Sequence, residues 1–461
     1  MECFAVYVDE IEGRIDPHFY RVEIKKIKNA LKNKCGEHLF GEVIKEIYRY
    51  PTFYGINYLS SGIKVIKGES ITKEGIIEQD IEFDYINKET HKRFIKTHIR
   101  KGDLVFTVRG FVGKVGYYNL EDEANINANV IKIRIKENFN PQFFWIFLNS
   151  VKGQLLIENL TSGQVQKTIT VPDIKNIQVP IPDIKIQNHI VQIMDNAYKI
   201  KKQKGTEAKQ LLDSIDEFVI QELKINFKKK KRTTFSINLD NIKNRLDPLF
   251  YSTDLYYFLN NSEYPNATIE SICNNLITGF AAGKNDQNLN KEGIIQIRPT
   301  NINQQRQLVF EKCIFIDFKQ KGKRNSYLLN NEDILFNNTN SQELVGKSTF
   351  FNIEGNYFCS NHITRIRIKK EKINSLYLTH ILNLYQRNNF FFRICTNWNN
   401  QSGININLLK TIKIPLPTLS IQNKIAEEVK RRMQKAERLQ NEAKQLLQEA
   451  KAKVEKIILS E

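Results

Sequence analysis

The chain has 461 residues, and its 69 Lys and Arg against 51 Asp and Glu give a formal net charge of +18. No apolar run approaches the roughly 18 to 20 residues that span a bilayer, and the N-terminus lacks the basic segment of an export signal. The excess of positive charge favours a large polyanion as partner, with nucleic acid ahead of an anionic membrane surface. A generally basic surface without such a partner is the alternative.

The cysteines and histidines argue against a metal site. The six cysteines are scattered without a C-x-x-C pair, so neither a zinc site nor a disulfide scaffold is predicted, and a reducing cytoplasm fits best. The seven histidines show no H-E-x-x-H or paired ligand spacing. We therefore expect no metal and no cofactor.

Three segments of the sequence occur twice, about half the chain length apart, which indicates a tandem duplication. The pairs are "RIDPHFY" (14–20) with "RLDPLFY" (245–251), "IQVPIPDIKIQNHI" (177–190) with "IKIPLPTLSIQNKI" (412–425), and "EAKQLL" at 207–212 and again at 442–447.

Each copy has the same order of predicted elements. Strands alternate apolar and polar residues, a polar loop closed by Gly-Lys separates two of them, and a helical segment with an aromatic face follows. The matching segments are 61–71 with 292–302, 101–118 with 331–351, 127–136 with 361–370, and 141–150 with 376–385. Each copy is thus expected to be an α+β domain of mostly antiparallel strands.

A long helix is predicted at the end of each copy. Prolines at 180, 182, 415 and 417 enforce an extended approach, and Asp183 and Thr418 directly after them are good helix N-caps. Apolar residues then recur at steps of four and three, as in a coiled coil. They are Ala208, Leu212, Ile215 and Val219 in the first helix and Ala443, Leu447, Ala450, Val454 and Ile457 in the second. Helices of about 40 residues would each be roughly 60 Å long.

We expect the two helices to pair as an antiparallel coiled coil that spaces two globular domains; a helix packed on its own domain is the alternative. The predicted boundaries are 1–183 for a first recognition domain, 184–226 for its helix, 227–234 for a basic linker, 235–418 for a second recognition domain and 419–461 for its helix.

This doubled order resembles the specificity subunit of type I restriction-modification enzymes. The matching residues are Pro180, Pro182 and Gln187 with Pro415, Pro417 and Gln422, the Ser-Gly turns in "TSGQ" (161–164) and "QSGI" (401–404), and the loop "LVFTVRGFVGKVG" (104–116). The family commonly has an acid before the Gln, whereas Ile186 and Ile421 stand there. The resemblance covers essentially the whole chain.

The resemblance implies a non-catalytic, prokaryotic defence subunit that binds a bipartite, asymmetric site in double-stranded DNA. It also implies two methyltransferase subunits as partners, together with restriction or translocase subunits, and no membrane. The alternatives are a coiled-coil adaptor that binds nucleic acid without sequence preference, and a DNA-modifying enzyme with unrecognised motifs.

Fragments that resemble catalytic motifs do not hold up. "VGKST" (345–349) lacks the Gly that a phosphate-binding loop needs at Ser341. "PDIK" (172–175 and 182–185) lacks a second nearby carboxylate for metal-assisted hydrolysis. No Asn-Pro-Pro-aromatic segment and no Gly-rich cofactor loop are present, so catalytic residues are predicted to be none.

The predicted DNA contacts are cationic and amide side chains in loops at strand ends, because these groups bind phosphates and base edges. A solvated loop residue is the alternative at each position. The candidates are Arg109, Lys114, Gln164, Gln166 and Lys167 in the first domain, and Asn338, Asn340, Gln342, Lys347, Asn397, Asn400 and Gln401 in the second.

Overall fold

The computed structural model divides into two compact units, Met1–Thr206 with Leu439–Glu461, and Glu207–Arg438. It describes residues 21–49, 57–72, 74–79, 81–161, 168–225, 236–239, 242, 248–251, 262–288, 290, 292–398 and 401–459. The opening repeat of the first copy, residues 245–247 of its counterpart in the second, and the basic run at 228–232 lie outside these residues.

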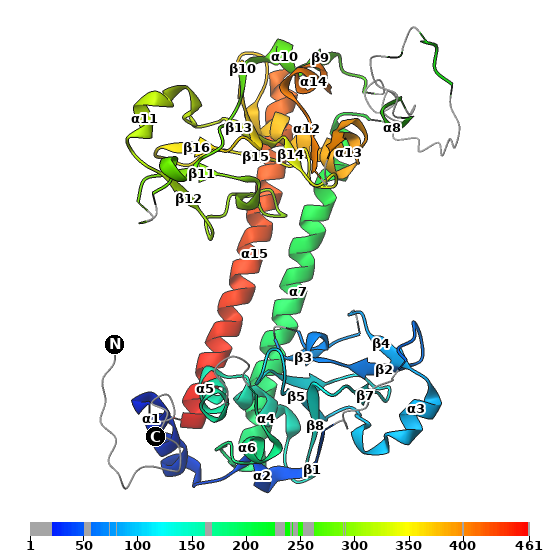
Figure 1. Cartoon of the computed structure of the whole chain (residues 1–461), viewed down its shortest axis with the longest axis vertical. Helices are drawn as coiled ribbons and strands as arrows, with labels where there is room; N and C mark the ends of the chain where they lie inside the picture. The colour runs from blue at the N-terminus through cyan, green and yellow to red at the C-terminus, as the bar shows by residue number, and fades with distance from the viewer. Residues whose placement is uncertain are drawn as a thin grey trace. The chain divides into compact units, whose positions relative to one another are not determined.

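The first unit is built on a five-stranded sheet in the order β1-β8-β5-β6-β3, in which only β3 runs parallel to its neighbour. A three-stranded sheet, β4-β2-β7, lies beside it (Figure 1). The strands are β1 (Ile44–Arg49), β2 (Ile63–Ile66), β3 (Ile76–Ile77), β4 (Asp84–Ile86), β5 (Leu104–Thr107), β6 (Val115–Tyr118), β7 (Asn125–Ile126) and β8 (Val130–Ile135).

All four side chains of strand β5 are buried. Because successive side chains of a strand point to opposite sides of a sheet, β5 contributes to a core on each face. Leu104 and Phe106 belong to a core shared with the helices, whereas Val105 belongs to a second core beneath the small sheet. The helices are α1 (Val22–Cys35), α2 (Phe40–Val43), α3 (Lys88–Arg93), α4 (Pro141–Leu148), α5 (Val151–Leu160) and α6 (Val171–Lys175).

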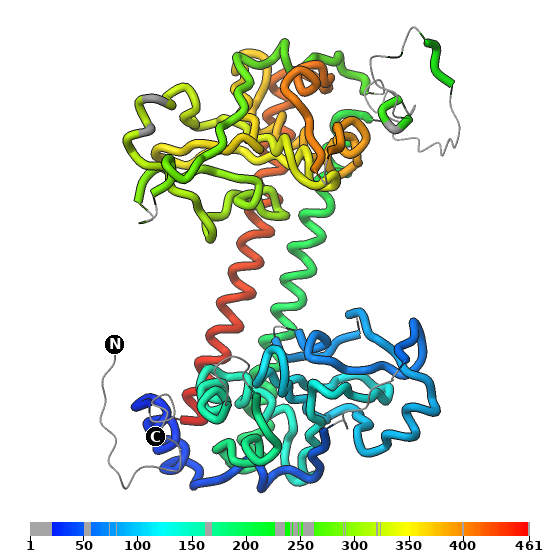
Figure 2. Tube along the Cα trace, viewed as in Figure 1, coloured from blue at the N-terminus to red at the C-terminus, as the bar shows by residue number. Residues whose placement is uncertain are grey.

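The second unit repeats this plan with a four-stranded antiparallel sheet, β10-β17-β13-β15, and three smaller sheets, β12-β11-β16, β14-β19-β18 and β20-β9 (Figure 1). Figure 2 traces the path of the chain through the unit. The strands are β9 (Asn266–Thr268), β10 (Cys273–Thr278), β11 (Ile294–Ile297), β12 (Ile314–Ile316), β13 (Ile334–Asn337), β14 (Thr339–Asn340), β15 (Ser348–Phe350), β16 (Tyr357–Cys359), β17 (Ile363–Ile368), β18 (Thr396–Trp398), β19 (Gln401–Gly403) and β20 (Lys413–Pro415). The helices are α8 (Pro248–Tyr251), α10 (Ile269–Ile272), α11 (Gln320–Lys323), α12 (Ser375–Arg387), α13 (Phe390–Ile394) and α14 (Ile406–Thr411).

Two long helices, α7 (Ile184–Glu222) and α15 (Leu419–Leu459), contribute to both units. In the first unit, Lys204 Nζ lies 2.7 Å from Glu442 Oε2. In the second unit, Arg432 donates to the Ser214 carbonyl at 2.9 Å, and Lys424 Nζ lies 2.8 Å from Glu222 Oε2. As the residue number increases along α7, the residue number of its partner in α15 decreases. The predicted α+β class and the antiparallel pairing of the two helices are therefore confirmed.

Apolar residues of both helices enter the core of each unit. Met194 and Ala197 share the first core with Leu447 and Val454, and Val219 shares the second with Val429. Each domain thus packs on the long helix that follows it and also on the other long helix. The two helices pair as predicted, and each also packs against its own domain, which was the alternative. No helix in the described ranges is long and apolar enough to cross a membrane.

A buried glutamine ties the start of each long helix to the preceding domain. Gln187 accepts a hydrogen bond from the Asn140 N–H at 2.9 Å and donates to the Pro182 carbonyl at 2.8 Å. Gln422 does the same with the Asn374 N–H at 2.9 Å. It also donates to the carbonyl of the preceding Pro-x-Pro segment at 2.9 Å. The motif glutamines therefore satisfy backbone groups that would otherwise be buried without partners.

Candidate nucleic-acid interface

A small sheet in the second unit gathers several predicted contacts. Strand β19 pairs with β14 on one side and β18 on the other, so Asn340 and Asn397 both lie opposite Ser402, while Trp398 lies opposite Gln401. The three predicted candidates Asn340, Asn397 and Gln401 therefore come from separate segments to one sheet. The pairing of these strands brings the three residues close together, which the sequence alone could not predict.

The Ser-Gly pair of this sheet is required by packing. A Cβ atom at Gly403 would overlap the Trp398 ring and lie 3.2 Å from the Asn338 carbonyl oxygen. The Ser402 hydroxyl donates to Asn397 Oδ1 at 2.6 Å. Trp398 nevertheless remains 46% exposed, which leaves an aromatic surface beside the amide side chains.

The amides of this sheet differ in what they leave available. Asn340 Oδ1 accepts from the Ser341 N–H at 2.8 Å and Asn397 Oδ1 accepts from Ser402, so each presents its NH₂ group. Gln401 is exposed, and among the described residues nothing engages its amide. A free carboxamide can donate and accept together, which is the pattern that adenine requires in the major groove.

Two predicted contacts hold the loop in place from inside. Asn338 is buried, donates to Thr364 Oγ1 at 2.9 Å and accepts from Thr339 Oγ1 at 2.7 Å. Gln342 donates to the Phe392 carbonyl at 2.9 Å. Their amide groups are used within the unit, so they position the strand-end loop.

Lys347 belongs to a cluster with surplus positive charge. Its side chain is buried, the residue being 7% exposed, and burial followed by the nearby charge of Arg306 lowers its pKa. Burial, followed by the charge of Arg387, lowers the pKa of Arg306 to about 10. The nearby carboxylate of Asp216 is held by Arg387 at 2.6 Å. Within the described residues, no carboxylate forms an ion pair with Lys347 or Arg306.

Arg306 itself carries two signs of a specialised position. Its φ of +67° lies in the left-handed region, which is uncommon for a residue with a side chain. Its guanidinium donates through Nη2 to Gln386, while the buried Nε has no partner. A cation removed from water without an ion pair of its own is costly, and an anion brought to the cluster would lower that cost.

The equivalent lysine of the first unit has a different environment. Lys114 also precedes a β-strand after a glycine, but its half-buried ammonium donates to the Ile71 carbonyl. Burial lowers its pKa as well. The described residues of the Ile71 loop contain no arginine comparable to Arg306, and the Lys114 ammonium is engaged by a backbone carbonyl.

The β5–β6 loop presents an exposed arginine and an exposed aromatic ring. Arg109 is exposed, and Phe111 beside it is 82% exposed. The Thr107 hydroxyl bonds to the Phe111 carbonyl and accepts the Lys114 N–H at 2.9 Å, which anchors the loop. Gly110 and Gly113 adopt φ of +77° and +87°, which only glycine does readily.

Sequence reasoning missed Phe111 and Arg306. The signal for Phe111 was present, since an aromatic residue between two glycines in a strand-to-strand loop has no core to enter. No local signal distinguishes Arg306 from other surface arginines. Four predicted contacts, Gln164, Gln166, Lys167 and Asn400, lie outside the described residues.

Comparison with known proteins gives consistent matches. The family model described as type I restriction modification DNA specificity domain matches residues 22–210 and 258–449. The chain is 24% identical over 391 residues to the StySPI specificity subunit of a type I restriction enzyme from Salmonella potsdam, covering 82% of this chain and 77% of that one. It is 26% identical over 206 residues to the EcoBI specificity subunit from Escherichia coli, of whose length it covers 42%.

Among solved structures, one described as the structural basis of complex assembly and conformational transition of the type I R-M system superposes with a TM-score of 0.52. The sequences are 14% identical, and the match covers 93% of this chain and 98% of the other. At this identity the likeness concerns the fold.

Proposed function

Because the family model matches it twice over most of its length, this chain belongs to the type I restriction-modification DNA specificity family, and we propose that it reads a bipartite, asymmetric DNA site. It is a non-catalytic specificity subunit, and each of its two recognition domains reads one half of the site. We place these domains at residues 1–183 and 235–418, as the sequence predicts.

One observation supports this proposal above the others. The two units share the same sheet plan and the same glutamine joint to a long helix, yet their strand-end loops differ in chemistry. The β5–β6 loop of the first unit exposes Arg109 and Phe111. The equivalent loop of the second unit has Gln342 and the exposed Leu344 in their place. Two domains with the same fold but different loop side chains would bind two different half-sites. We therefore expect a recognition site that is not a palindrome.

The proposed base contacts are the exposed groups at the strand ends. Arg109 is suited to the two acceptors of guanine, and Gln401 is suited to the donor and acceptor of adenine. Phe111 and Trp398 offer apolar surfaces that can contact a thymine methyl group or enter a base step. Lys347 and Arg306 form a phosphate contact that orients the second domain.

The proposed partners follow from family membership. Double-stranded DNA is the ligand, two methyltransferase subunits dock on the chain and perform the chemistry, and restriction or translocase subunits complete the system. The paired helices α7 and α15 set the number of unread base pairs between the two half-sites.

Competition binding distinguishes this function from a non-specific adaptor. We expect the full chain, assembled with its methyltransferase subunit, to bind one duplex sequence more tightly than random duplex, and to keep this preference as salt is raised. Specific contacts to base edges withstand screening, whereas phosphate-only binding falls with counterion release. An equal loss of binding to both duplexes at every salt concentration would favour the non-specific adaptor. Methyl transfer by the purified chain alone would favour a DNA-modifying enzyme.

The lysine pair provides a matched mutational test. Lys347→Met should weaken binding to specific and random duplex alike, by about tenfold at low salt, and reduce the slope of log K against log salt by about one. Lys114→Met is the control and should change affinity less than about twofold, because the Ile71 carbonyl already engages its ammonium. Fluorescence anisotropy across a salt series measures both, with thermal melts to confirm folding. Equal effects of the two substitutions would contradict the phosphate contact.

A further inference from the structure

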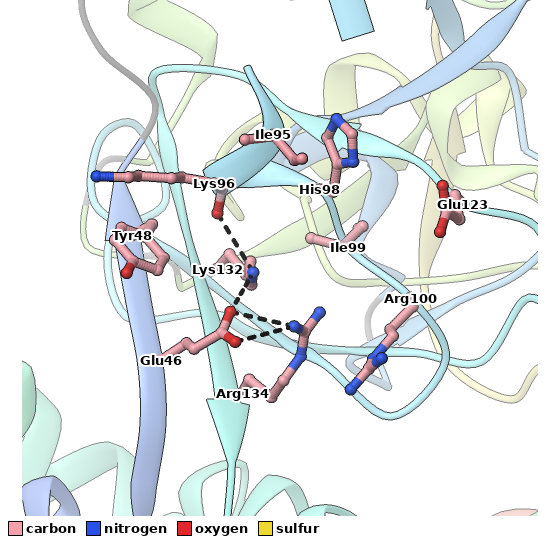
Figure 3. A pocket seen from close by; sticks show the side chains of 10 residues that line it. All are labelled: Glu46, Tyr48, Ile95, Lys96, His98, Ile99, Arg100, Glu123, Lys132 and Arg134. Atoms are coloured by element: carbon pink, nitrogen blue, oxygen red, sulfur yellow. Dashed lines mark hydrogen bonds and ion pairs between the residues drawn. The ribbon is translucent and has the colours of Figure 1, made fainter. Parts of the chain in front are cut away.

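A pocket of about 410 Å³ lies on one face of the large sheet in the first unit. Its lining comes mainly from β1, β8 and the segment around the 3-10 turn Ile95–Thr97 (Figure 3). Lys132 and Arg134 of β8 line it, whereas Ile133 between them enters the core that the helices cover. None of the DNA contacts proposed above comes from this pocket.

The central ion pairs of the pocket are balanced in charge. The buried Lys132 ammonium lies 2.7 Å from Glu46 Oε2, and Arg134 lies 3.1 Å from the same carboxylate. Arg134 also binds Asp103 through two hydrogen bonds of 2.8 and 2.7 Å. Two cations therefore face two carboxylates, and this group has no net charge to offer a ligand.

Two further cations line the pocket without an acid of their own. Lys96 and Arg100 are exposed, and in the part of the chain that the structure describes neither forms an ion pair. Glu137 is near Arg100, but its carboxylate already lies 2.5 Å from Lys45 Nζ. Lys96 Nζ lies 5.8 Å from the centroid of the Tyr48 ring. Figure 3 shows Lys96 and Arg100 on either side of the balanced ion pairs.

One carboxylate of the pocket offsets part of this charge. Glu123 is exposed, and its Oε2 atom lies 3.6 Å from His91 Nε2. Outside the balanced ion pairs, the lining therefore carries two positive charges and one negative charge, with His98 counted as neutral. One negative charge, as a phosphodiester carries, matches the remaining positive charge.

The second unit has neutral residues where the first has these two cations. In both units, the buried cation of β8 or β17 donates to a carbonyl of a 3-10 turn, which belongs to Lys96 in the first unit and to Ser326 in the second. In both, the Asp just before β5 or β13 accepts a backbone N–H, from Arg100 in the first unit and from Asn330 in the second. These shared bonds use only the backbone of the four residues, so the fold does not explain the two cations.

We infer that Lys96 and Arg100 bind the sugar-phosphate backbone of DNA at this pocket, in a contact that belongs to the first domain alone. The inference rests on the proposed DNA-binding function and adds an anchor that reads no base. Arg and Lys side chains are common ligands of backbone phosphates, and the Tyr48 hydroxyl adds a further donor. Such a contact fixes the orientation of the first domain on the duplex without contributing to the choice of bases.

The test is a salt series of DNA binding by the full chain assembled with its methyltransferase subunit. The probes are a labelled random duplex and a labelled duplex that carries the motif methylated in the host. Lys96→Gln and Arg100→Gln should each weaken binding to both duplexes at least about threefold at low salt, and reduce the slope of log K against log salt by about one. The ratio of the two affinities should not change, because phosphate contacts carry no base information. Both side chains are exposed, and thermal melts confirm that the variants fold.

Two further substitutions serve as controls. Lys26→Gln removes the same charge from α1, whose buried residues pack on the other face of the large sheet, and it should change affinity less than about twofold. Glu123→Gln removes the unbalanced acid of the pocket and should tighten binding to both duplexes.

The outcomes separate this inference from the proposed function. If Lys96→Gln and Arg100→Gln behave as Lys26→Gln does while the complex still prefers the motif duplex, the backbone contact is wrong and the proposed function stands. If the unsubstituted complex shows no such preference, the proposed function fails, and the slopes on random duplex still decide the contact. Inorganic phosphate that displaces DNA more than chloride of equal ionic strength, from the unsubstituted chain but not from the Lys96→Gln variant, would assign the pocket to a free anion and contradict the inference.

Discussion

Exchanging residues 235–410 for the corresponding segment of a family member with another target should change one half of the recognised motif and leave the other half and the gap unchanged. The second unit has its own core, and its strand-end loops lie wholly within the exchanged segment. The glutamine joint at Gln422 and helices α7 and α15 remain those of this chain. The expected effect is complete loss of modification at the original site and its appearance at a hybrid site.

The reciprocal exchange of residues 1–183 is the control and should alter only the opposite half. Sequencing of modified bases in cells that carry each hybrid measures both outcomes. Simultaneous change of both halves, or a change of gap length with the halves retained, would contradict recognition by two independent domains.

Asp333→Ala should be among the most destabilising single substitutions in the chain. The Asp333 carboxylate is 1% exposed and binds Arg367 through two hydrogen bonds of 2.8 and 2.7 Å, and it also accepts the Asn330 N–H at 2.7 Å. Its pairing raises the pKa of Arg367. Removal takes the carboxylate away from Arg367 and from the buried Arg365, which lies 4.0 Å from it, and this costs about 3 to 5 kcal/mol.

Asp103→Ala in the first unit is the matched comparison. Arg134 makes the same two bonds to Asp103, at 2.8 and 2.7 Å, but it also retains Glu46 at 3.1 Å. Glu46 remains beside Arg134 after substitution, whereas Asp333 is the acid that the described residues place in an ion pair with the buried Arg365, so the loss for Asp103→Ala should be smaller by at least about 1 kcal/mol. Denaturant unfolding of both variants measures the difference. A loss for Asp333→Ala below about 1 kcal/mol, or a greater loss for Asp103→Ala, would refute the assigned role.

The strands and long helices could be predicted because their signals are local. Alternating apolar residues specify β8 and β17, and short apolar runs specify β5 and β13. The prolines before Asp183 and Thr418 limit where the long helices begin. The doubling of these signals made the α+β plan and the antiparallel helix pair predictable from one sequence.

The interface could be predicted only as a set of loops, because its chemistry depends on contacts between distant segments. Asn338 and Asn397 look alike in sequence, yet one is bonded inside the unit and the other is exposed in β18. Lys114 and Lys347 occupy equivalent positions, but only the second lies beside an arginine from another loop.

The most direct test is to map methylated adenines across the host genome with and without this gene. We predict an asymmetric motif of two short blocks separated by a fixed unread gap, present in the parent, absent after deletion and restored by the intact gene. A methylome that is unchanged by deletion, or a lost motif that is continuous or palindromic, would contradict the proposal that this chain reads two different half-sites.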